Sequence, residues 1–480
     1  MSAPETKISS FPFWWHARSQ NRHLWLLSLQ EMYGTTFRHH PNAVCINTPS
    51  AYHQIYGPRG NVKKGLLYEV WQRTVEVQNT WSTTSIEIHT RKRRVLNHAF
   101  SDSTLRGAEP FIHSNVDRWL DLLCQHRHDS REWSKSIDMA DQVTYVLFDI
   151  LGDLCFDQSS DLKEPESDLR YVLETINGFV ETVHSLSMSP WAPVWVWLKP
   201  YGLDKLLALA TPPAIKSWDA FVAICQESRA EKQSALEQKF NSEKRRDFFH
   251  WLWEAKDPDR GEGYSISELS SACELLVIAG SDAMAMVVAG LFFYLSHDQE
   301  AQNRLAKEIA ATFSSYDEIR AGTKLRSCSY LTAYGQYFPH GSSISTACWA
   351  THYNADYFHE PYQFLPDRWM AEEAGATAQS VAVAEGALCF FSTSPHGCIG
   401  KKLAWQVMRL IMAKVFWKFQ MRQDPNRTLR GGTPNAEWGR YREGQYQTWD
   451  MFGSKRKGPI IQLRERARGD QDAGNRAQRV

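Results

Sequence analysis

One cysteine, Cys398, lies between two glycines in the stretch Phe-Ser-Thr-Ser-Pro-His-Gly-Cys-Ile-Gly at residues 391–400. A helical pattern follows at once, beginning near Lys401. The spacing therefore predicts a thiol at a helix N-terminus, where unpaired N–H groups and the helix dipole favour the thiolate. Such a thiolate can be the axial ligand of a haem iron. The alternative is a buried structural thiol, a common fate of cysteine.

The same stretch resembles the cysteine loop of the cytochrome P-450 family, the haem-thiolate monooxygenases. The resemblance implies that Cys398 is the metal ligand, that Phe391 packs beneath its sulfur and that Gly400 belongs to the loop. His396 stands where the family usually has arginine, and it can still donate a hydrogen bond to a haem propionate.

Residues 279–284, Ala-Gly-Ser-Asp-Ala-Met, resemble the motif of the family's oxygen-binding helix, Ala-Gly-x-Asp/Glu-Thr-Thr. By this resemblance, Gly280 lets the helix backbone approach a flat ligand, and Asp282 helps to route protons to bound oxygen. Ala283 occupies the place of the usual threonine, and its side chain can neither donate nor accept a hydrogen bond. The missing hydroxyl leaves a haem-thiolate isomerase or a peroxide-driven oxidant as alternatives to a monooxygenase.

The helix that contains this motif is almost wholly apolar from Leu275 to Leu295, as a membrane-spanning helix would be. Asp282 near its middle would cost about 2.5–3.5 kcal/mol in a bilayer, and no second comparable segment follows in the sequence. A buried core helix therefore explains the pattern better. The alternative for Asp282 itself is a solvated or capped carboxylate.

A basic run at residues 89–101 resembles the family's helix that faces the haem propionates. His89 and Arg93 are four residues apart and share one helix face. Arginine suits a carboxylate because its planar guanidinium can bind both oxygens at once. The alternative is a solvated basic face.

Residues 364–369, Phe-Leu-Pro-Asp-Arg-Trp, resemble the family's Phe-x-Pro-Glu-Arg-Phe segment. By the resemblance, its arginine, here Arg368, joins a Glu-x-x-Arg pair on a preceding helix. No such pair occurs between Met284 and Arg368, and Asp317–Arg320 offers only Asp and Arg at that spacing, too far upstream.

Ser329–Ala333 looks like the start of the expected helix, but Tyr334–Gly341, which resembles a later strand and turn, follows at once. We therefore predict that one helix and the hairpin after it are absent, as in a deleted or mis-spliced form. Arg368 would then turn to solvent, because an unpaired buried charge costs about 3–5 kcal/mol. A haem-poor remnant without enzyme activity is a third alternative.

The chain of 480 residues carries 54 Lys and Arg and 54 Asp and Glu side chains, a balance that does not favour nucleic acid as a partner. Its 9 cysteines are scattered without a Cys-x-x-Cys pair, which indicates a reducing compartment and no zinc site. Residues 1–32 show no clear membrane anchor. The aromatic segment Phe11–Trp15 is expected either to rest at a membrane surface or to pack against the domain.

Hydrophobic periodicity predicts helices at Leu105–Cys124 and Leu169–His184. Ser265 and Glu268 have the spacing of a capping box that opens a helix to about Leu295. Strands are expected at Ala43–Thr48, Ser343–Trp349 and Ile460–Leu463. A small-residue loop is expected at Ala371–Gly386 and a disordered C-terminal tail at residues 464–480.

The sequence thus predicts one mainly helical domain with small β-sheets over residues 1–480, in the haem-thiolate fold that the resemblance implies. The resemblance also implies haem as cofactor, electrons from NADPH through NADPH-cytochrome P-450 reductase, and oxidation of a small apolar substrate by O2. Asn47–Tyr52 and Phe452–Arg456 are most similar to filamentous-fungal members, which commonly oxidise secondary metabolites. The expected location is the cytoplasmic face of the endoplasmic reticulum membrane.

Overall fold

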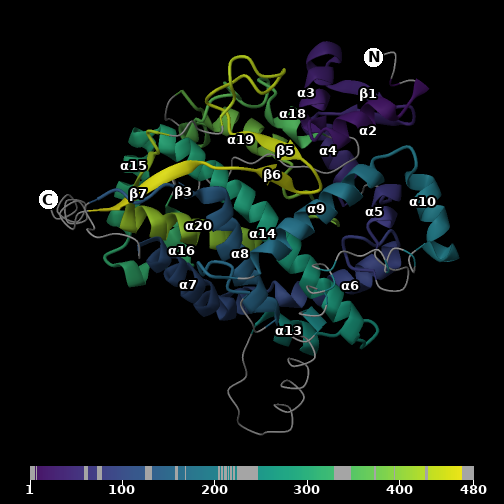
Figure 1. Cartoon of the computed structure of the whole chain (residues 1–480), viewed down its shortest axis with the longest axis horizontal. Helices are drawn as coiled ribbons and strands as arrows, with labels where there is room; N and C mark the ends of the chain where they lie inside the picture. The colour runs from purple at the N-terminus through teal and green to yellow at the C-terminus, as the bar shows by residue number, and fades with distance from the viewer. Residues whose placement is uncertain are drawn as a thin grey trace, which may run out of the picture.

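The computed structural model describes most of the chain: residues 6, 8–58, 63–72, 78–124, 132–156, 160–167, 169–203, 206, 209, 213, 216, 219, 222–223, 247–328, 347–371, 375–393, 395–426 and 431–466. Within these parts the fold is mainly helical and carries three small sheets (Figure 1). The predicted fold class is therefore confirmed.

The helices of the described residues are α2 Phe11–Arg18, α3 Arg22–Tyr33, α4 Pro49–Tyr56, α5 Leu66–Val70, α6 Ile86–Ala99, α7 Asp102–Cys124, α8 Met139–Phe156, α9 Arg170–Ser187, α10 Ala192–Leu198, α13 Phe248–Glu254, α14 Ile266–His297, α15 Gln299–Thr312, α16 Thr323–Ser327, α18 Cys348–His352, α19 Ala378–Ala387 and α20 Lys401–Lys418. Short 3-10 turns are η1 Lys199–Tyr201, η2 Tyr316–Glu318 and η3 Pro366–Trp369. The strands are β1 Thr36–His40, β2 Ala43–Ile46, β3 Ile137–Asp138, β4 Phe419–Gln423, β5 Thr448–Asp450, β6 Ser454–Arg456 and β7 Ile460–Glu465.

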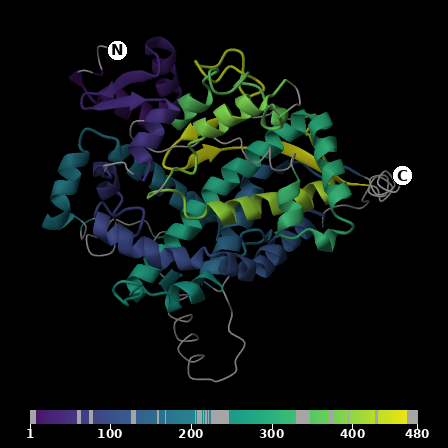
Figure 2. The same cartoon turned by 180° about the vertical axis from the view of Figure 1, so that it is seen from behind.

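The N-terminal elements and the C-terminal strand lie at opposite sides of the molecule. Figure 1 shows α2, α3 and β1 at the upper right and β7 at the left, and Figure 2 shows the same separation from behind. Helix α14 passes through the middle, where it packs against α8, α13, α15 and α20. The central helix therefore meets both α20, which follows the cysteine loop, and α8 of the first half of the chain.

Helix α14 forms the centre because it is almost wholly apolar from Leu275 to Leu295. The predicted capping box is present, with Ser265 accepting from the N–H of Glu268 while the Glu268 side chain accepts from the N–H of Ser265. A Cβ on Gly280 would come within 2.7 Å of Cδ1 of Leu151, so this glycine allows α14 and α8 to approach closely. Of the described helices, α14 alone is long and apolar enough to cross a membrane, but 61% of its most apolar window is buried inside the protein.

The three-stranded sheet continues directly from α20. Strand β4 pairs antiparallel with β7, with Phe419 opposite Glu465 and Gln423 opposite Ile461, and β3 pairs with the other edge of β7. Strand β7 extends to Glu465, so the start predicted for the disordered tail, residue 464, is two residues too early. Residues 467–480 of that predicted tail lie outside the described residues.

Two other predicted segments differ from the structure. Cys348–Trp349, expected to end a strand, opens α18, in which the N–H of Thr351 donates to the carbonyl of Ala347 at 2.9 Å. A short apolar run does not distinguish strand from helix by periodicity alone. The predicted loop Ala371–Gly386 contains α19, because Thr377 caps an alanine-rich run with high helix propensity.

A buried ion pair ties the β5–β6 hairpin to the N-terminal helices. Arg22, the first residue of α3, donates to both carboxylate oxygens of Asp450 at 2.8 and 3.2 Å. The Asp450 side chain is 1% exposed and that of Arg22 9%. Because neither charge reaches water, removing the Asp450 carboxylate would leave the Arg22 charge in the interior without this anion.

The variant Asp450→Asn should therefore lower the free energy of unfolding by about 3–5 kcal/mol, the usual cost of breaking a buried pair from one side. Asp102→Asn is the matched control, because the Lys402–Asp102 pair is exposed to water at 65% and 69%. Urea denaturation of both variants in the same haem state measures the difference. Equal losses in the two variants would contradict the structural role given to Asp450.

Candidate active site

The cysteine loop ends where α20 begins. The N–H of Cys398 donates to the carbonyl of Phe391 at 2.7 Å, which closes the loop. The N–H groups of Gly400 and Lys401 donate to the Cys398 sulfur. Gly400 is the N-cap residue of α20 and provides no side-chain cap, so the sulfur accepts from N–H groups that the helix leaves unpaired.

Two opposing effects act on the ionisation of Cys398. Its side chain touches solvent, yet protein atoms crowd the sulfur, and this desolvation raises the pKa of the thiol above its ordinary value. The two N–H groups and the positive charges of Arg93 and Lys401 lower the pKa, but they do not overcome the desolvation. The helix end therefore favours the thiolate, and a bound metal cation would lower the pKa of the thiol further.

The ring of Phe391 is fixed beside the start of α20. Its centroid lies 4.6 Å from that of Phe390 and 6.0 Å from that of Trp405, and the ammonium of Lys401 lies 5.5 Å from it. A Cβ on Gly400 would lie 4.0 Å from the Cys398 sulfur, in ordinary contact. The position of Phe391 beneath an iron-bound sulfur stays a prediction.

Basic side chains gather beside the loop. The guanidinium of Arg93 donates to the carbonyl of Gly397 at 2.8 Å, which ties α6 to the residue before Cys398. The rings of His89 and His396 lie 4.5 Å apart. Burial, followed by the charges of Lys64, His396 and Arg93, lowers the pKa of His89 from 6.5 to about 4. The structure thus brings together the three basic residues that the sequence proposed as propionate partners.

Lys64 joins this group, and the sequence analysis did not identify it. Its ammonium donates to the carbonyls of Thr80 and Trp81 at 2.8 Å each. Burial, with a contribution from the charge of Arg93, lowers the pKa of Lys64 to about 8. No local motif marks this lysine, because its relation to Arg93 arises only when the segment before α5 folds against α6.

The donor set fits haem. Within the described ranges, no group of three or more His, Cys, Asp or Glu side chains could hold a metal ion by itself. One sulfur beside several cations instead suits a metal that brings its own ring of nitrogen ligands and carboxylates at the ring's edge. In the described part of the chain, Nδ1 of His396 is buried and has no hydrogen-bond partner. A propionate oxygen would satisfy it.

The middle of α14 presents a narrow open face. Ala279 and Ala283 are one turn apart and exposed, whereas the residues between Met284 and Phe293 are buried. Gly280 faces α8 rather than this open strip, so the close approach that it permits here is one between helices. Ala283 therefore presents a methyl group where the family has a hydroxyl.

Asp282 is held by the β5–β6 hairpin. Nη1 of Arg456 donates to Oδ1 of Asp282 at 2.7 Å, and Nη2 donates to Thr144 at 2.9 Å. A Cβ on Gly453 would overlap the Asp282 carboxylate, so the backbone of the hairpin turn rests directly on it. Asp282 is thus an ion-paired carboxylate, neither simply solvated nor a helix cap.

An aromatic cluster lies on the same hairpin. The ring of Phe452, which precedes Gly453, lies 4.6 Å from the rings of both Trp71 and Trp81. The two tryptophans flank residues 73–77, which lie outside the described ranges. The hairpin therefore connects the carboxylate of α14 with this aromatic cluster. The sequence analysis did not identify Trp71 and Trp81, since no local motif marks them.

Arg368 bonds to backbone carbonyls. Its Nη2 donates to the carbonyls of Glu360 at 2.8 Å and Gln363 at 3.2 Å, while the adjacent Asp367 pairs with Arg304 of α15 at 3.0 Å. Ser329–Gly341, on which the predicted absence of a helix and hairpin rests, lie outside the described residues.

A sequence model of the family described as Cytochrome P-450 matches residues 7–334 and 328–432. The chain belongs to the cytochrome P-450 family. The two matched stretches meet at residues 328–334, which is where the sequence predicted that a helix and a hairpin are absent.

This cytochrome P-450 is similar to curated fungal proteins over most of its length. It is 27% identical over 493 residues to "Cytochrome P-450 monooxygenase AKT7" of Alternaria alternata, covering 96% of this chain and 91% of the relative. It is 28% identical over 492 residues to "Cytochrome P-450 monooxygenase fscF" of Fusarium equiseti, covering 96% and 90%. Both alignments have more positions than the chain has residues, 480. Each relative therefore has residues that this chain lacks.

Solved structures agree with the fold. A crystal structure of a cytochrome P-450 (CYP102L1) has a TM-score of 0.67 at 14% identity and covers 93% of this chain and 94% of its own. The haem domain of cytochrome P-450DA has a TM-score of 0.69 at 14% identity and covers 96% and 95%. Together with the relatives' names, the family membership makes this protein a haem monooxygenase and an oxidoreductase, and does not favour an isomerase or an inactive remnant.

The variant Lys64→Met should release haem about ten-fold faster, because it removes an ammonium that would donate to a haem propionate. A hydrogen bond to a charged group contributes about 1.5–3 kcal/mol. Lys402→Met is the control, since Lys402 is an exposed lysine close to the same loop. Transfer of haem to an excess of apomyoglobin measures the rate. Identical rates for Lys64→Met and wild type would show that Lys64 does not help to hold haem.

Proposed function

We propose that this cytochrome P-450 oxidises a small apolar molecule of fungal secondary metabolism, with electrons that NADPH-cytochrome P-450 reductase delivers from NADPH. The observation that carries the proposal is the Cys398 sulfur at the N-terminus of α20, with Arg93 beside it and with His396 and Lys64 close to Arg93. The relatives in Alternaria and Fusarium support the fungal setting.

Haem bound through Cys398 supplies reductive activation of O2 and insertion of one oxygen atom into a C–H bond. The chain holds and orients the reactants. Arg93 and Lys64 would hold the haem carboxylates. Ala279 and Ala283 offer only methyl groups to a substrate against α14, which suits an apolar substrate. By the family resemblance, Asp282 helps to route protons to bound oxygen, and the hydrogen bond from Arg456 orients its carboxylate.

The charge of the surface near the sulfur supports the proposed docking of a redox partner. Lys401 and Lys402 are exposed and open α20 directly after the cysteine loop. Positive charge at this place favours docking of a partner that presents an acidic face. A location on the cytoplasmic face of the endoplasmic reticulum stays a prediction.

The test is the absorption spectrum of the purified, dithionite-reduced protein with and without carbon monoxide. A strongly red-shifted Soret band is expected, because thiolate ligation by Cys398 produces it. A protein without haem, or one with the band of neutral-thiol or histidine ligation, would overturn the proposal. Cys398→Ser, which removes the thiolate, is the matched negative control.

Ala283→Thr should raise the product formed per NADPH consumed about two- to ten-fold, because the added hydroxyl supplies a hydrogen bond worth about 0.5–1.5 kcal/mol at the open face of α14. Ala279→Thr places the same side chain one turn away and serves as the control. Parallel measurement of NADPH oxidation and product, with a substrate that shifts the Soret band, gives the ratio. If both variants match wild type, position 283 does not govern coupling.

A further inference from the structure

Two thiol groups meet where α18 contacts the segment that leads into the cysteine loop. Cys348 is the first residue of α18, and Cys389 lies two residues before Phe391, whose carbonyl closes that loop. The thiol groups of Cys348 and Cys389 hydrogen-bond to each other, and the Cys348 sulfur lies 3.9 Å from the carbonyl oxygen of Cys389. Two sulfurs in such contact can be joined by a disulfide bond.

The two thiols differ in their access to solvent. Cys348 is half-buried, whereas Cys389 is 5% exposed. The hydrogen bond with Cys348, followed by burial, raises the pKa of the Cys389 thiol. Cys389 therefore keeps its proton, and a hydrogen bond that it donates favours the thiolate on Cys348. The more accessible sulfur is thus the one that can react first.

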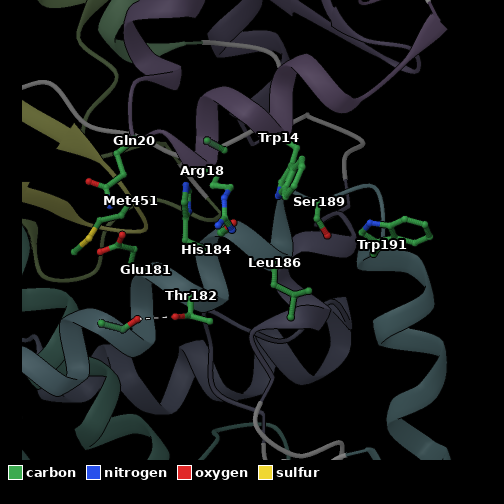
Figure 3. A pocket seen from close by; sticks show the side chains of 13 residues that line it. Trp14, Arg18, Gln20, Glu181, Thr182, His184, Leu186, Ser189, Trp191 and Met451 are labelled. Carbon is green, nitrogen blue, oxygen red and sulfur yellow. Dashed lines mark hydrogen bonds between the residues drawn. The ribbon is translucent and has the colours of Figure 1, made fainter.

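A small reagent reaches Cys348 from the solvent side. The pocket of about 620 Å³ in Figure 3 is lined by residues of α2, α9 and the β5–β6 hairpin, Trp14, Thr182 and Met451 among them, and by no described cysteine. That pocket therefore does not lead to the thiol pair. The partial exposure of Cys348 provides the route instead.

A histidine base contacts the buried thiol. Nε2 of His352, one turn after Cys348 on α18, lies 3.4 Å from the Cys389 sulfur and accepts from the N–H of Cys389 at 3.3 Å. A backbone N–H can only donate, so Nε2 carries the lone pair and can also accept from the thiol. Burial lowers the pKa of His352 to about 4, which keeps the ring neutral. A proton acceptor is therefore in place at the second sulfur.

Other thiols of the described chain are held differently. Cys45 of β2, which is close to Cys348, donates to Oδ1 of Asn47 at 3.0 Å, and burial raises its pKa to about 12. Cys155 of α8 and Cys273 of α14 hydrogen-bond to each other, but both are completely buried. The pair at α18 thus combines contact between sulfurs, a base and access to solvent.

We propose that Cys348 and Cys389 are a peroxide-sensitive thiol pair that forms a disulfide bond between α18 and the segment leading into the cysteine loop. The Cys348 thiolate attacks one oxygen of hydrogen peroxide, the O–O bond breaks, and the released hydroxide takes a proton from solvent. The Cys389 sulfur then attacks the sulfenic acid on Cys348 and the S–O bond breaks. The proton of Cys389 passes through His352 to the departing hydroxide. Two thiols thus lose two electrons, and the peroxide becomes two waters.

The disulfide restrains the segment that positions the haem ligand. The carbonyl of Cys389 accepts from the hydroxyl of Tyr52 at 3.2 Å and from the N–H of Ser392 at 3.1 Å, so this residue is already a fixed point before the loop. A covalent bond to α18 removes conformations in which the segment separates from that helix. Formation of the disulfide requires neither a substrate nor a reductase, so it is tested separately from the monooxygenase activity.

The experiment treats the folded holoenzyme with a small molar excess of hydrogen peroxide, at a dose that leaves the Soret band intact. Remaining thiols are then alkylated, and linked peptides are identified by mass spectrometry. A Cys348–Cys389 link that dithiothreitol reverses is expected, with a rise in the temperature of unfolding. Cys348→Ser should abolish both effects. His352→Gln should slow formation of the link at least about ten-fold, because Cys389 loses its proton acceptor.

The Cys155–Cys273 pair is the matched comparison within the same molecule, because its thiols also hydrogen-bond but are inaccessible to solvent. A Cys155–Cys273 link that forms equally fast, a link between Cys45 and Cys348, or oxidation of Cys348 to the sulfinic acid without any link would each overturn the proposal. Free Cys348 and Cys389 after the treatment would overturn it as well. Thermal denaturation of the reduced variants shows whether each is folded.

Discussion

The position of one sulfur depends on backbone N–H groups that α20 cannot satisfy within itself. Every α-helix leaves its first N–H groups unpaired, and here Gly400 and Lys401 direct theirs to Cys398. The bond from Cys398 to the carbonyl of Phe391 fixes the other side of the loop. The end of a helix thus sets the sulfur's place, and α14 and the sheet after α20 pack against that helix.

Beside the sulfur the fold gathers positive charge that it does not neutralise. The charges that lower the pKa of His89 are all basic, and burial lowers the pKa of Lys64 as well. Bringing such groups together costs stability in the free protein. The cost is offset when a ligand supplies carboxylates, because Arg93 and Lys64, which bond to neutral backbone carbonyls, then gain an anion. A cluster of basic side chains that costs stability is therefore a mark of the binding site.

Local patterns were sufficient where the structure depends on neighbours in sequence. The capping box of Ser265 and Glu268, the length of α14 and the helix after Cys398 were all predictable for this reason. Lys64 was not, because it meets Arg93 only through packing of separate segments. The partner of Asp282 was equally hidden, since Arg456 lies 174 residues away in sequence. These side chains reach the site only through tertiary packing.

The β5–β6 hairpin has a mechanical consequence. One side of its turn carries Phe452 against two tryptophans, and the other side rests on the carboxylate of Asp282 at Gly453. The contact at Gly453 is too close to admit even a methyl group, so the turn has no slack in that direction. The turn thus joins the aromatic cluster around Phe452 to the carboxylate of the central helix with no space between them. Any side chain larger than hydrogen at position 453 would have to displace one of these two neighbours.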